Sequence, residues 1–320
     1  VFGDWSSDVC SSDLNINIKN VEYLCILIFM NIQADIIPMN YKIRENEEEK
    51  LSLFNDGQLS LFFVGTGSAF TKKLYQTNLL IIKGDDHILI DCGTKTPQAF
   101  HELGVPVSKI KKYLITHSHA DHIGGLEEVM LSGKYITKTK PEMIITKTYK
   151  HLLWDLSLRG GCGFNQDDFG YPLVFEDFFE VKYPERINDY SRDAYHYNTG
   201  KIDIRMFRTM HIPEEDTWDS GFWSCGVIID DKVLYSGDTR FDPGFLYELD
   251  KKHNFKAIFH DCQFFTGGVH SGIDELKTLK PEIKKKMFLM HYGDNFEDYK
   301  DKIKEYGFLD FARQWVYYDF

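Results

Sequence analysis

The sequence predicts an α/β fold, and three observations lead to this expectation. The chain has 320 residues, of which 43% are hydrophobic, enough for one large α/β domain or two small ones with a sizeable core. Short apolar runs, partly β-branched, are followed by segments with a helical pattern. A cluster of histidines and aspartate follows one of these runs, at a strand-to-helix connection, where α/β folds place their chemistry.

The elements can be assigned in chain order from apolar runs and turn residues. Residues 39–55 predict a short arm or an opening strand, and Gly84-Asp85-Asp86 and Asp230-Asp231 mark hairpin turns. The expected strands are 59–64, 79–82, 87–91, 110–115, 202–209, 223–229, 232–235, 257–260, 287–290 and 314–318. The expected helices are 96–103, one beginning near Leu126, one within 144–158, 243–252, one entered after the loop 267–274, and one before the last strand.

The segment of about 132–200 departs from this succession, and we expect it to be an insertion. Residues 144–158 begin as a strand and become a helix, 160–163 predict a flexible turn, and 169–183 are aromatic and acidic with strand-like stretches. We expect a lid or a subunit contact over the site. The alternative is a peripheral loop with its own small hydrophobic cluster.

The first 38 residues differ from the rest. Residues 5–14 are low in complexity, and 21–30 are apolar but shorter than the ~20 residues that a membrane span needs. A basic stretch and a cleavage site typical of a signal peptide are not evident. We therefore expect 1–38 to be a non-native or disordered leader, with the true start at Met39 or Met30, and 39–320 to be one folded domain.

Charge and cysteine usage narrow the functional classes. The net charge of −12 argues against a chain built to hold polyanions, since nucleic-acid binding depends on dense Lys and Arg. The six cysteines are scattered without a CxxC pair, which predicts reduced thiols in a cytoplasmic protein. They are Cys10, Cys25, Cys92, Cys162, Cys225 and Cys262.

The run His117-Ser118-His119-Ala120-Asp121-His122 is the strongest signal in the chain. His117 and His119, two apart in an extended segment, point the same way, whereas Asp121 and His122 follow the bend and can face a second point. Imidazoles with a carboxylate are the ligand set of zinc or a similar transition metal, so two pairs predict two metals. The alternative is a polar loop with chance histidines, against which the total of twelve histidines in the chain argues.

Three later residues each follow the end of a predicted strand, on the same edge as the central run: His211, Asp238 and His291. Their recurrent placement predicts convergence on one site, although either histidine could instead be a non-ligand. A histidine ligand needs an acceptor that fixes its tautomer, and Asp91 and Asp261 are candidates. These two carboxylates could also be strand-end or turn caps.

The central run resembles the HxHxDH signature of the metallo-β-lactamase superfamily. VGTGSAF, IDCG and LITHSHADHIGGL, within about 59–131, resemble the tRNase Z-like branch, and separate motifs extend the resemblance through about 202–292. The resemblance implies an αββα sandwich of two mixed β-sheets flanked by helices. It also implies two divalent metal ions, Zn²⁺ in the first place and Mn²⁺ as the alternative. The implied ligands are His117, His119 and His211 for the first metal, Asp121, His122 and His291 for the second, and Asp238 for both.

His270 is implied by the same resemblance to be a catalytic histidine that binds no metal. Val269-His270-Ser271 is similar to the loop in which tRNase Z-like members place a histidine that can protonate the leaving oxygen. The alternative is that Ser271 caps a helix and His270 is exposed. The family also suggests that Asp121 orients the attacking water or takes its proton. The histidines expected to be non-catalytic are His101, His151, His196 and His253.

Several aromatic side chains could stack a nucleobase, although aromatic residues more commonly belong to the core. These candidates are Phe70, Tyr75, Trp154, Trp218, Phe264 and Phe265.

Four functions compete: a 3′,5′-cyclic mononucleotide phosphodiesterase that uses a metal-bound hydroxide, a tRNA 3′-processing endoribonuclease, another hydrolase such as a lactonase, thioesterase or β-lactamase, and a non-catalytic metal-binding module. The complete ligand set argues against the last and His270 against the third. The acidic charge disfavours tRNA, and so does the lack of an evident long, basic, Gly/Pro-rich arm of the kind with which tRNA-processing members of the superfamily grip tRNA. The chain is similar in this respect to the anti-Pycsar proteins of phages and bacteria, which degrade cyclic mononucleotide defence signals. We expect a small anionic nucleotide as partner, no stable nucleic-acid partner, no membrane, and by analogy a homodimer.

Overall fold

The computed structural model describes residues 41–47, 50–164 and 169–320. The expected leader, 1–38, lies outside the described residues. Within the described ranges, no helix has the length and apolar character that crossing a bilayer requires.

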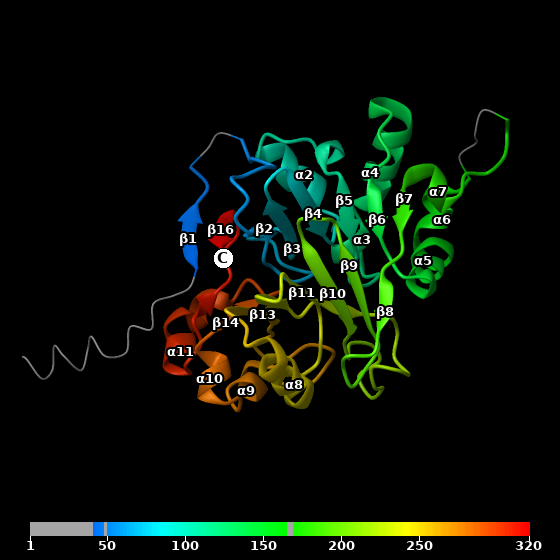
Figure 1. Cartoon of the computed structure of the whole chain (residues 1–320). Coiled ribbons are helices and arrows are strands. Elements are labelled where there is room, and N and C mark those ends of the chain that lie inside the picture. Colours follow the sequence, from blue (N-terminus) through cyan, green and yellow to red (C-terminus); the bar gives the residue numbers. More distant parts are fainter. Residues whose placement is uncertain (1–40, 48–49, 165–168) are drawn as a thin grey trace, which may run out of the picture. The chain divides into compact units, whose positions relative to one another are not determined.

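Two mixed eight-stranded sheets form the centre of the molecule (Figure 1). The first has the order β1-β16-β2-β3-β4-β5-β6-β7, antiparallel from β1 to β4 and parallel from β4 to β7. Its strands are β1 (Lys42–Glu45), β16 (Val316–Asp319), β2 (Ser60–Gly65), β3 (Asn78–Lys83), β4 (Asp86–Ile90), β5 (Lys112–Leu114), β6 (Glu142–Ile144) and β7 (Glu180–Lys182).

The second sheet has the order β15-β14-β13-β12-β11-β10-β9-β8, parallel from β15 to β12 and antiparallel from β12 to β8. Its strands are β15 (Asp310–Phe311), β14 (Met287–Met290), β13 (Ala257–Asp261), β12 (Val233–Tyr235), β11 (Cys225–Ile229), β10 (Asp203–Arg208), β9 (Ala194–Asn198) and β8 (Glu185–Ile187).

Helices cover the outer face of each sheet, which confirms the αββα sandwich (Figure 1). On the first sheet lie α2 (Thr96–Glu102) and α4 (Leu126–Ser132), and on the second α8 (Pro243–His253), α9 (Ile273–Leu276), α10 (Pro281–Lys284) and α11 (Lys300–Glu305). The other helical elements are α3 (Ala120–Ile123), α5 (Lys147–Leu153), α6 (Arg159–Cys162), α7 (Phe175–Phe178), η1 (Val107–Lys109), η2 (Gly133–Thr137), η3 (Trp154–Leu158) and η4 (Phe296–Tyr299).

The alternation of side chains along the strands builds two apolar layers. In β14, Phe288 and Met290 join the cluster between the sheets, whereas Met287 and Leu289 join the cluster beneath the helices of the second sheet. Phe63 of β2 lies 4.9 Å from Phe259 of β13, ring centre to ring centre, and so connects the two sheets. Burial of each aromatic or aliphatic side chain contributes ~1.5–3 kcal/mol to the free energy of unfolding. The two sheets therefore form a stable base for the loops at their edge.

The segment 132–200 is continuous with the domain. Its strands β6 and β7 extend the first sheet and β8 and β9 extend the second, so the segment spans both layers. Trp154 and Phe175, whose rings lie 5.9 Å apart, belong to the same large buried cluster as the core residues of the first sheet. The alternative of a peripheral loop with its own hydrophobic cluster is therefore wrong.

The expected flexible turn at 160–163 is wrong for residues 160–162, because α6 continues the helical path of α5 and η3 as far as Cys162, whereas Gly163 does lie in a turn. Cys162 is fully buried there. At Gly161 a Cβ would lie 2.6 Å from a carboxylate oxygen of Glu127 in α4, so the glycine permits close approach of the two helices. Within 169–183 the structure forms one helical turn, α7, and the short strand β7.

Candidate metal centre

The central run follows β5 and is shaped by one carboxylate. Asp91 accepts hydrogen bonds from the backbone N–H of Thr116 at 2.7 Å and from its hydroxyl at 2.8 Å, which fixes the chain just before His117. His119 is the last extended residue before α3. Asp121 and His122 therefore lie on a short helix that the sequence reasoning described only as a bend.

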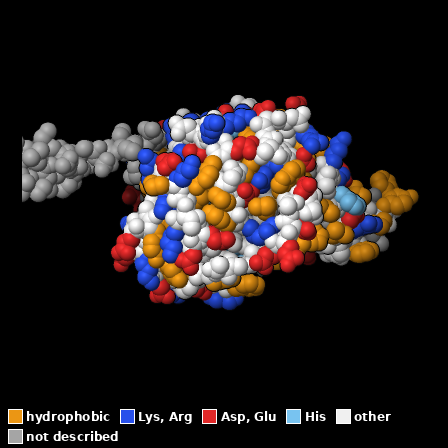
Figure 2. Space-filling model, turned by 90° about the horizontal axis from the view of Figure 1, so that it is seen from below, with side chains coloured by type: hydrophobic (Ala, Val, Ile, Leu, Met, Phe, Trp, Pro, Cys, Tyr) orange, Lys and Arg blue, Asp and Glu red, His pale blue; other side chains and the backbone are white. Residues whose placement is uncertain are grey.

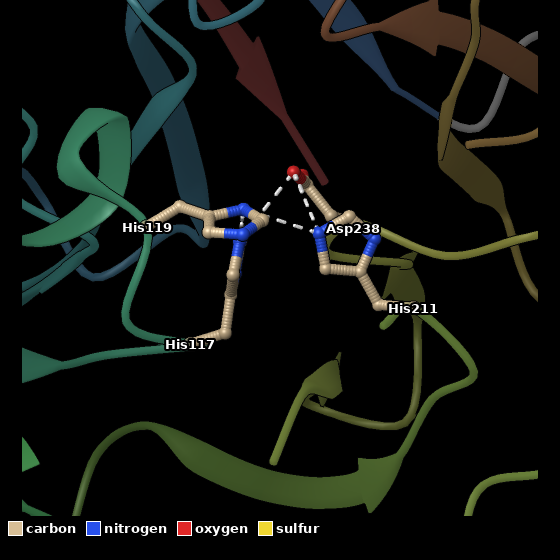
Figure 3. Close-up of side chains that lie close together, drawn as sticks. All are labelled: His117, His119, His211 and Asp238. Carbon is tan, nitrogen blue, oxygen red and sulfur yellow. Dashed lines mark hydrogen bonds and ion pairs between the residues drawn. The ribbon is translucent and has the colours of Figure 1, made fainter. Parts of the chain in front are cut away.

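The first ligand group consists of His117, His119, His211 and Asp238 (Figure 3). Nε2 of His117 lies 3.0 Å from Nδ1 of His119, which in turn lies 3.2 Å from Nε2 of His211. Oδ2 of Asp238 lies 3.7 Å from Nε2 of His117 and 4.0 Å from Nε2 of His211. The four side chains thus point at one another from the ends of β5, β10 and β12.

The second group shares Asp238 with the first and adds Asp121, His122 and His291. Nε2 of His122 lies 3.2 Å from Oδ2 of Asp121 and 3.2 Å from Oδ2 of Asp238. Nε2 of His291 lies 3.2 Å and 3.3 Å from the same two oxygens. All four side chains are buried, so the structure brings together all seven residues predicted as ligands.

The donor sets fit divalent cations. In a tetrahedral zinc site with bonds of about 2.0–2.1 Å, two nitrogen ligands lie roughly 3.3 Å apart, close to the separations within the first group. Nε2 of His122 and Oδ2 of Asp238 are buried and form an ion-pair contact at 3.2 Å, but neither atom has a partner in hydrogen-bond geometry among the described residues. Buried polar atoms of this kind are costly unless a further group, such as a cation, satisfies them.

The electrostatics of the first group favour neutral imidazoles, which is the state that binds metal. Burial lowers the pKa of His117 well below its ordinary value and lowers the pKa of His211 to about 4. Burial also lowers the pKa of His119. The lone pairs of these three rings are therefore available near neutral pH.

The second group has an excess of negative charge, which a bound cation would compensate. Burial alone would lower the pKa of His291, but Asp238, Asp121 and Asp261 outweigh it and raise this pKa to about 10. The pKa of His122 is likewise raised well above its ordinary value, because the carboxylates around it outweigh its burial. A proton or a metal ion can supply the positive charge, and a metal can replace the protons.

Contacts with the surrounding structure orient the histidines, through hydrogen bonds at His122 and His211 and through an ion-pair contact at His291. Nδ1 of His122 lies 2.8 Å from Asp91, Nδ1 of His211 lies 2.8 Å from the carbonyl oxygen of Val269, and Nδ1 of His291 lies 3.5 Å from Asp261. Asp91 and Asp261 thus occupy the acceptor positions expected of them, and these contacts direct Nε2 of each ring toward the centre.

His270 lies at the edge of the same centre. Its Nδ1 donates to Asp261 at 2.8 Å, and its ring centre lies 5.0 Å from that of His211 and 4.8 Å from that of His291. Ser271 is buried and donates to the carbonyl of Thr239, and the N-cap of α9 is Gly272. The alternative in which Ser271 caps the helix and His270 is exposed is therefore wrong.

The other histidines named as non-catalytic lie outside both ligand groups. His151 contacts Asp155, His196 contacts Asp203, and His253 contacts Asp231. His101 lies in the last turn of α2 and is exposed. Cys92, Cys225 and Cys262 are buried thiols, while Cys10 and Cys25 lie outside the described residues.

The sequence did not predict the aromatic residues that line a pocket next to the first ligand group. Its aromatic lining is Tyr149, Phe222 and Trp223. None of the six predicted base-stacking residues lines it; Trp154, for example, is in the core, and Phe264 stacks on Tyr299 at 4.2 Å. The helical pattern around Tyr149 was visible in the sequence, but its contact with the metal centre depends on long-range packing.

Comparison with known proteins agrees with this geometry. The family model for "Anti-Pycsar protein Apyc1" matches residues 59–318. Two curated relatives carry the same name: the protein of Bacillus phage 010DV004 is 39% identical over 260 residues (80% of this chain, 96% of the relative). The protein of Bacillus phage BSP38 is 40% identical over 256 residues (78% and 94%).

Solved structures show the same fold at lower identity. The metallo-β-lactamase-fold protein YhfI from Bacillus subtilis has a TM-score of 0.58 and 16% identity, covering 82% of this chain and 99% of its own. The short form of human tRNase Z has a TM-score of 0.54 and 17% identity, covering 80% and 98%. The predicted fold and the predicted likeness to the anti-Pycsar proteins are confirmed: the chain has the metallo-β-lactamase fold and belongs to the anti-Pycsar protein Apyc1 family.

Proposed function

We propose that this protein is a metal-dependent hydrolase, specifically a phosphodiesterase that opens 3′,5′-cyclic mononucleotides with two divalent metal ions. The observation that carries the proposal is that the two largely buried ligand groups share Asp238, which also belongs to a third group with Asp261, His270 and His291. Membership of the anti-Pycsar family supports the substrate class, since the resemblance implies degradation of cyclic mononucleotide signals. We assign His117, His119 and His211 to one ion, Asp121, His122 and His291 to the other, and Asp238 to both.

When bound, two adjacent divalent cations would neutralise phosphate oxygens and lower the pKa of a water molecule. The residues of the chain then have separate tasks. The histidines and Asp238 hold the charges in place, and the carboxylate of Asp121 orients the attacking water or accepts its proton. His270, held by Asp261, donates a proton to the departing 3′ oxygen. Asp261 raises the pKa of His270 against the effect of its burial, which favours the protonated, donating form.

Charge and pocket size favour a small substrate over tRNA. The chain has a net charge of −12, and on the face shown in Figure 2 basic and acidic side chains are interspersed. A protein that grips tRNA gains most of its affinity from clustered Lys and Arg. The pocket beside the centre has a volume of about 250 Å³, which suits one ring system.

A turnover screen of the full chain with Zn²⁺ or Mn²⁺ tests the proposal. The substrates are the 3′,5′-cyclic mononucleotides, bis-p-nitrophenyl phosphate and precursor tRNA. Each assay is repeated from low to high salt concentration. We expect turnover of cyclic mononucleotides with a shallow salt dependence. Cleavage of precursor tRNA with a steep salt dependence and no turnover of cyclic nucleotides would instead establish the endonuclease. Turnover of lactones or thioesters alone would also refute the proposal, as would the absence of any hydrolysis.

We further propose a homodimer, by analogy with the family. Light scattering of the purified chain at micromolar concentration measures its mass. A mass of one chain at all concentrations would exclude the dimer.

A further inference from the structure

The loop that carries His270 contains two adjacent glycines in a backbone conformation that other residues rarely adopt. Gly267 and Gly268 have φ angles of 85° and 88°. Glycine adopts such angles without steric strain, but it also has more backbone freedom to lose on folding than any other residue. His270 therefore follows a stretch of chain whose conformation has to be fixed by contacts with other elements.

The two residues just before His270 are both held by side chains of the loop that follows β10. The backbone N–H of Gly268 donates to a carboxylate oxygen of Glu214 at 2.8 Å. The carbonyl oxygen of Val269 accepts from Nδ1 of His211, also at 2.8 Å, and Nε2 of the same ring faces the first ligand group (Figure 3). One of the two anchors is thus an assigned metal ligand, and the other is Glu214, which belongs to neither ligand group.

The backbone of Glu214 is itself fixed by the loop that follows β12. The guanidinium of Arg240 donates to the carbonyl oxygens of Glu214 and Asp216. The backbone N–H of Arg240 donates in turn to the carbonyl oxygen of Met210 at 2.6 Å, directly before His211. Because these bonds hold the main chain, the side chain of Glu214 can be changed without moving the loop that carries it.

We propose that Glu214 is a positioning residue, which fixes the loop of His270 through the N–H of Gly268 and thereby presets the proton donor at the metal centre. Asp261 orients the ring of His270, and Glu214 holds the backbone that delivers this ring. The inference rests on the proposed function, in which His270 protonates the departing oxygen. A proton donor acts only within hydrogen-bond reach of that oxygen, so loss of the Glu214 contact should slow the chemical step more than it weakens substrate binding.

Three variants of exposed glutamates test this role. Glu214→Ala removes the acceptor of the Gly268 N–H, whereas Glu214→Gln removes the charge but keeps an acceptor oxygen. Glu215→Ala is the matched control, since it removes a neighbouring carboxylate of the same charge that has no part in this hydrogen bond. The metal content of each preparation is measured beside its activity.

Two substrates with different leaving groups separate positioning of the proton donor from a general disturbance. A cyclic mononucleotide releases an alkoxide, which needs a proton, whereas bis-p-nitrophenyl phosphate releases a stable phenolate, which does not. In Glu214→Ala we expect kcat on the nucleotide to fall about 3- to 10-fold, the effect of losing one partly exposed hydrogen bond, with KM nearly constant. The kcat on bis-p-nitrophenyl phosphate and the metal content should equal those of the wild type, and Glu214→Gln and Glu215→Ala should match the wild type on both substrates.

A merely structural role of Glu214 would impair both substrates alike, so an equal fall on both would overturn the proposal. Full activity of Glu214→Ala on the nucleotide would overturn it as well. A fall in Glu214→Gln as large as in Glu214→Ala, or an equal fall in Glu215→Ala, would assign the effect to charge instead of to the hydrogen bond, and loss of metal would assign it to the ligands.

If the wild type does not hydrolyse cyclic mononucleotides, the proposed function fails, and the role of Glu214 is judged by hydrogen exchange of the full chain. The N–H of Gly268 is bound to Glu214, so a peptide that contains Gly268 should exchange faster in Glu214→Ala than in the wild type and in Glu215→Ala. Faster exchange would support the fixed loop without the activity. Equal exchange in the three proteins would overturn it.

Discussion

Asp261 accepts a hydrogen bond from Nδ1 of His270 at 2.8 Å, while its other oxygen lies 3.5 Å from Nδ1 of His291. One buried carboxylate therefore faces both the assigned proton donor and an assigned metal ligand. Burial would raise the pKa of Asp261, but His270 and His291 outweigh it and lower it to about 2. Asp261 is thus an anion that holds the two imidazoles in a fixed relation.

His270→Ala is expected to lower kcat on a cyclic mononucleotide about 10²- to 10⁴-fold, the usual contribution of a positioned general acid. Both metal ions should remain bound, because His270 belongs to neither assigned ligand set. Turnover and metal content of the same preparation check this. His151→Ala, at an exposed histidine paired with Asp155, is the control, and full activity of His270→Ala would exclude the proton-donor role.

Asp238→Ala and His119→Ala are expected to abolish turnover through loss of metal. Asp238 lies in both ligand groups, so its removal should reduce the content of both ions, whereas His119 lies only in the first. Metal analysis after dialysis distinguishes the two variants. If the Asp238 variant kept two ions per chain, the assignment of a bridging carboxylate would be wrong.

Removal of metal by a chelator is expected to lower the melting temperature. The second group concentrates Asp121 and Asp238 around two histidines in a buried site, and without an ion protons must supply the compensating charge. Readdition of Zn²⁺ or Mn²⁺ should restore stability in proportion to the logarithm of its concentration. Calorimetry with and without metal measures the shift, and identical melting curves would contradict the metal centre.

Gly93→Ala is expected to reduce activity about 100-fold or more, because a misplacement of about 1 Å at a catalytic site has effects of this size. A Cβ at Gly93 would lie 2.0 Å from the carbonyl oxygen of Asp121, so the turn carrying this ligand must shift. Gly160→Ala, where a Cβ meets nothing within 4 Å, is the matched control. Equal kcat/KM for the two variants would show that the centre tolerates the shift.

His87 should make the fold less stable as the pH falls. Burial, with help from Lys111, lowers its pKa to about 4, against an ordinary value of about 6.5 in the unfolded chain. Between these values the unfolded chain binds a proton that the folded chain does not, so the contribution of the neutral ring is complete above pH 6.5 and lost as the pH falls toward 4. The loss reaches about 3 kcal/mol. Urea unfolding of wild type and His87→Gln from pH 4 to 8 should give diverging curves; parallel curves would contradict this assignment.

Local patterns were sufficient to predict most of the framework. The hairpin of β3 and β4 followed from its turn residues, and α2 from Pro97 and Gly104. The convergence of His211 and His291 on the central run followed from their places after strands. The turns, the helix ends and the place of each histidine after a strand are encoded within a few neighbouring residues, and a shared sheet edge then brings the histidines together.

Features that depend on contacts between distant residues could not be predicted from the sequence. The glycines at 160 and 161 suggested a turn, but packing of α6 against Glu127 keeps the segment helical. Tyr149 and Trp223, far apart in the chain, form one wall only because β6 and β11 belong to sheets that face each other. The candidates for base stacking were chosen by residue type alone and for this reason missed the pocket.

The position of β16 in the first sheet has a consequence for biosynthesis. This strand pairs with β1 on one side and β2 on the other, yet it follows every assigned metal ligand in the chain. During synthesis the edge of β2 stays open until residues 316–319 have left the ribosome, so the first sheet is completed only after every assigned ligand has been synthesised. Capture of metal is then a late event, and nascent chains stalled before β16 should be sensitive to protease even when metal is abundant.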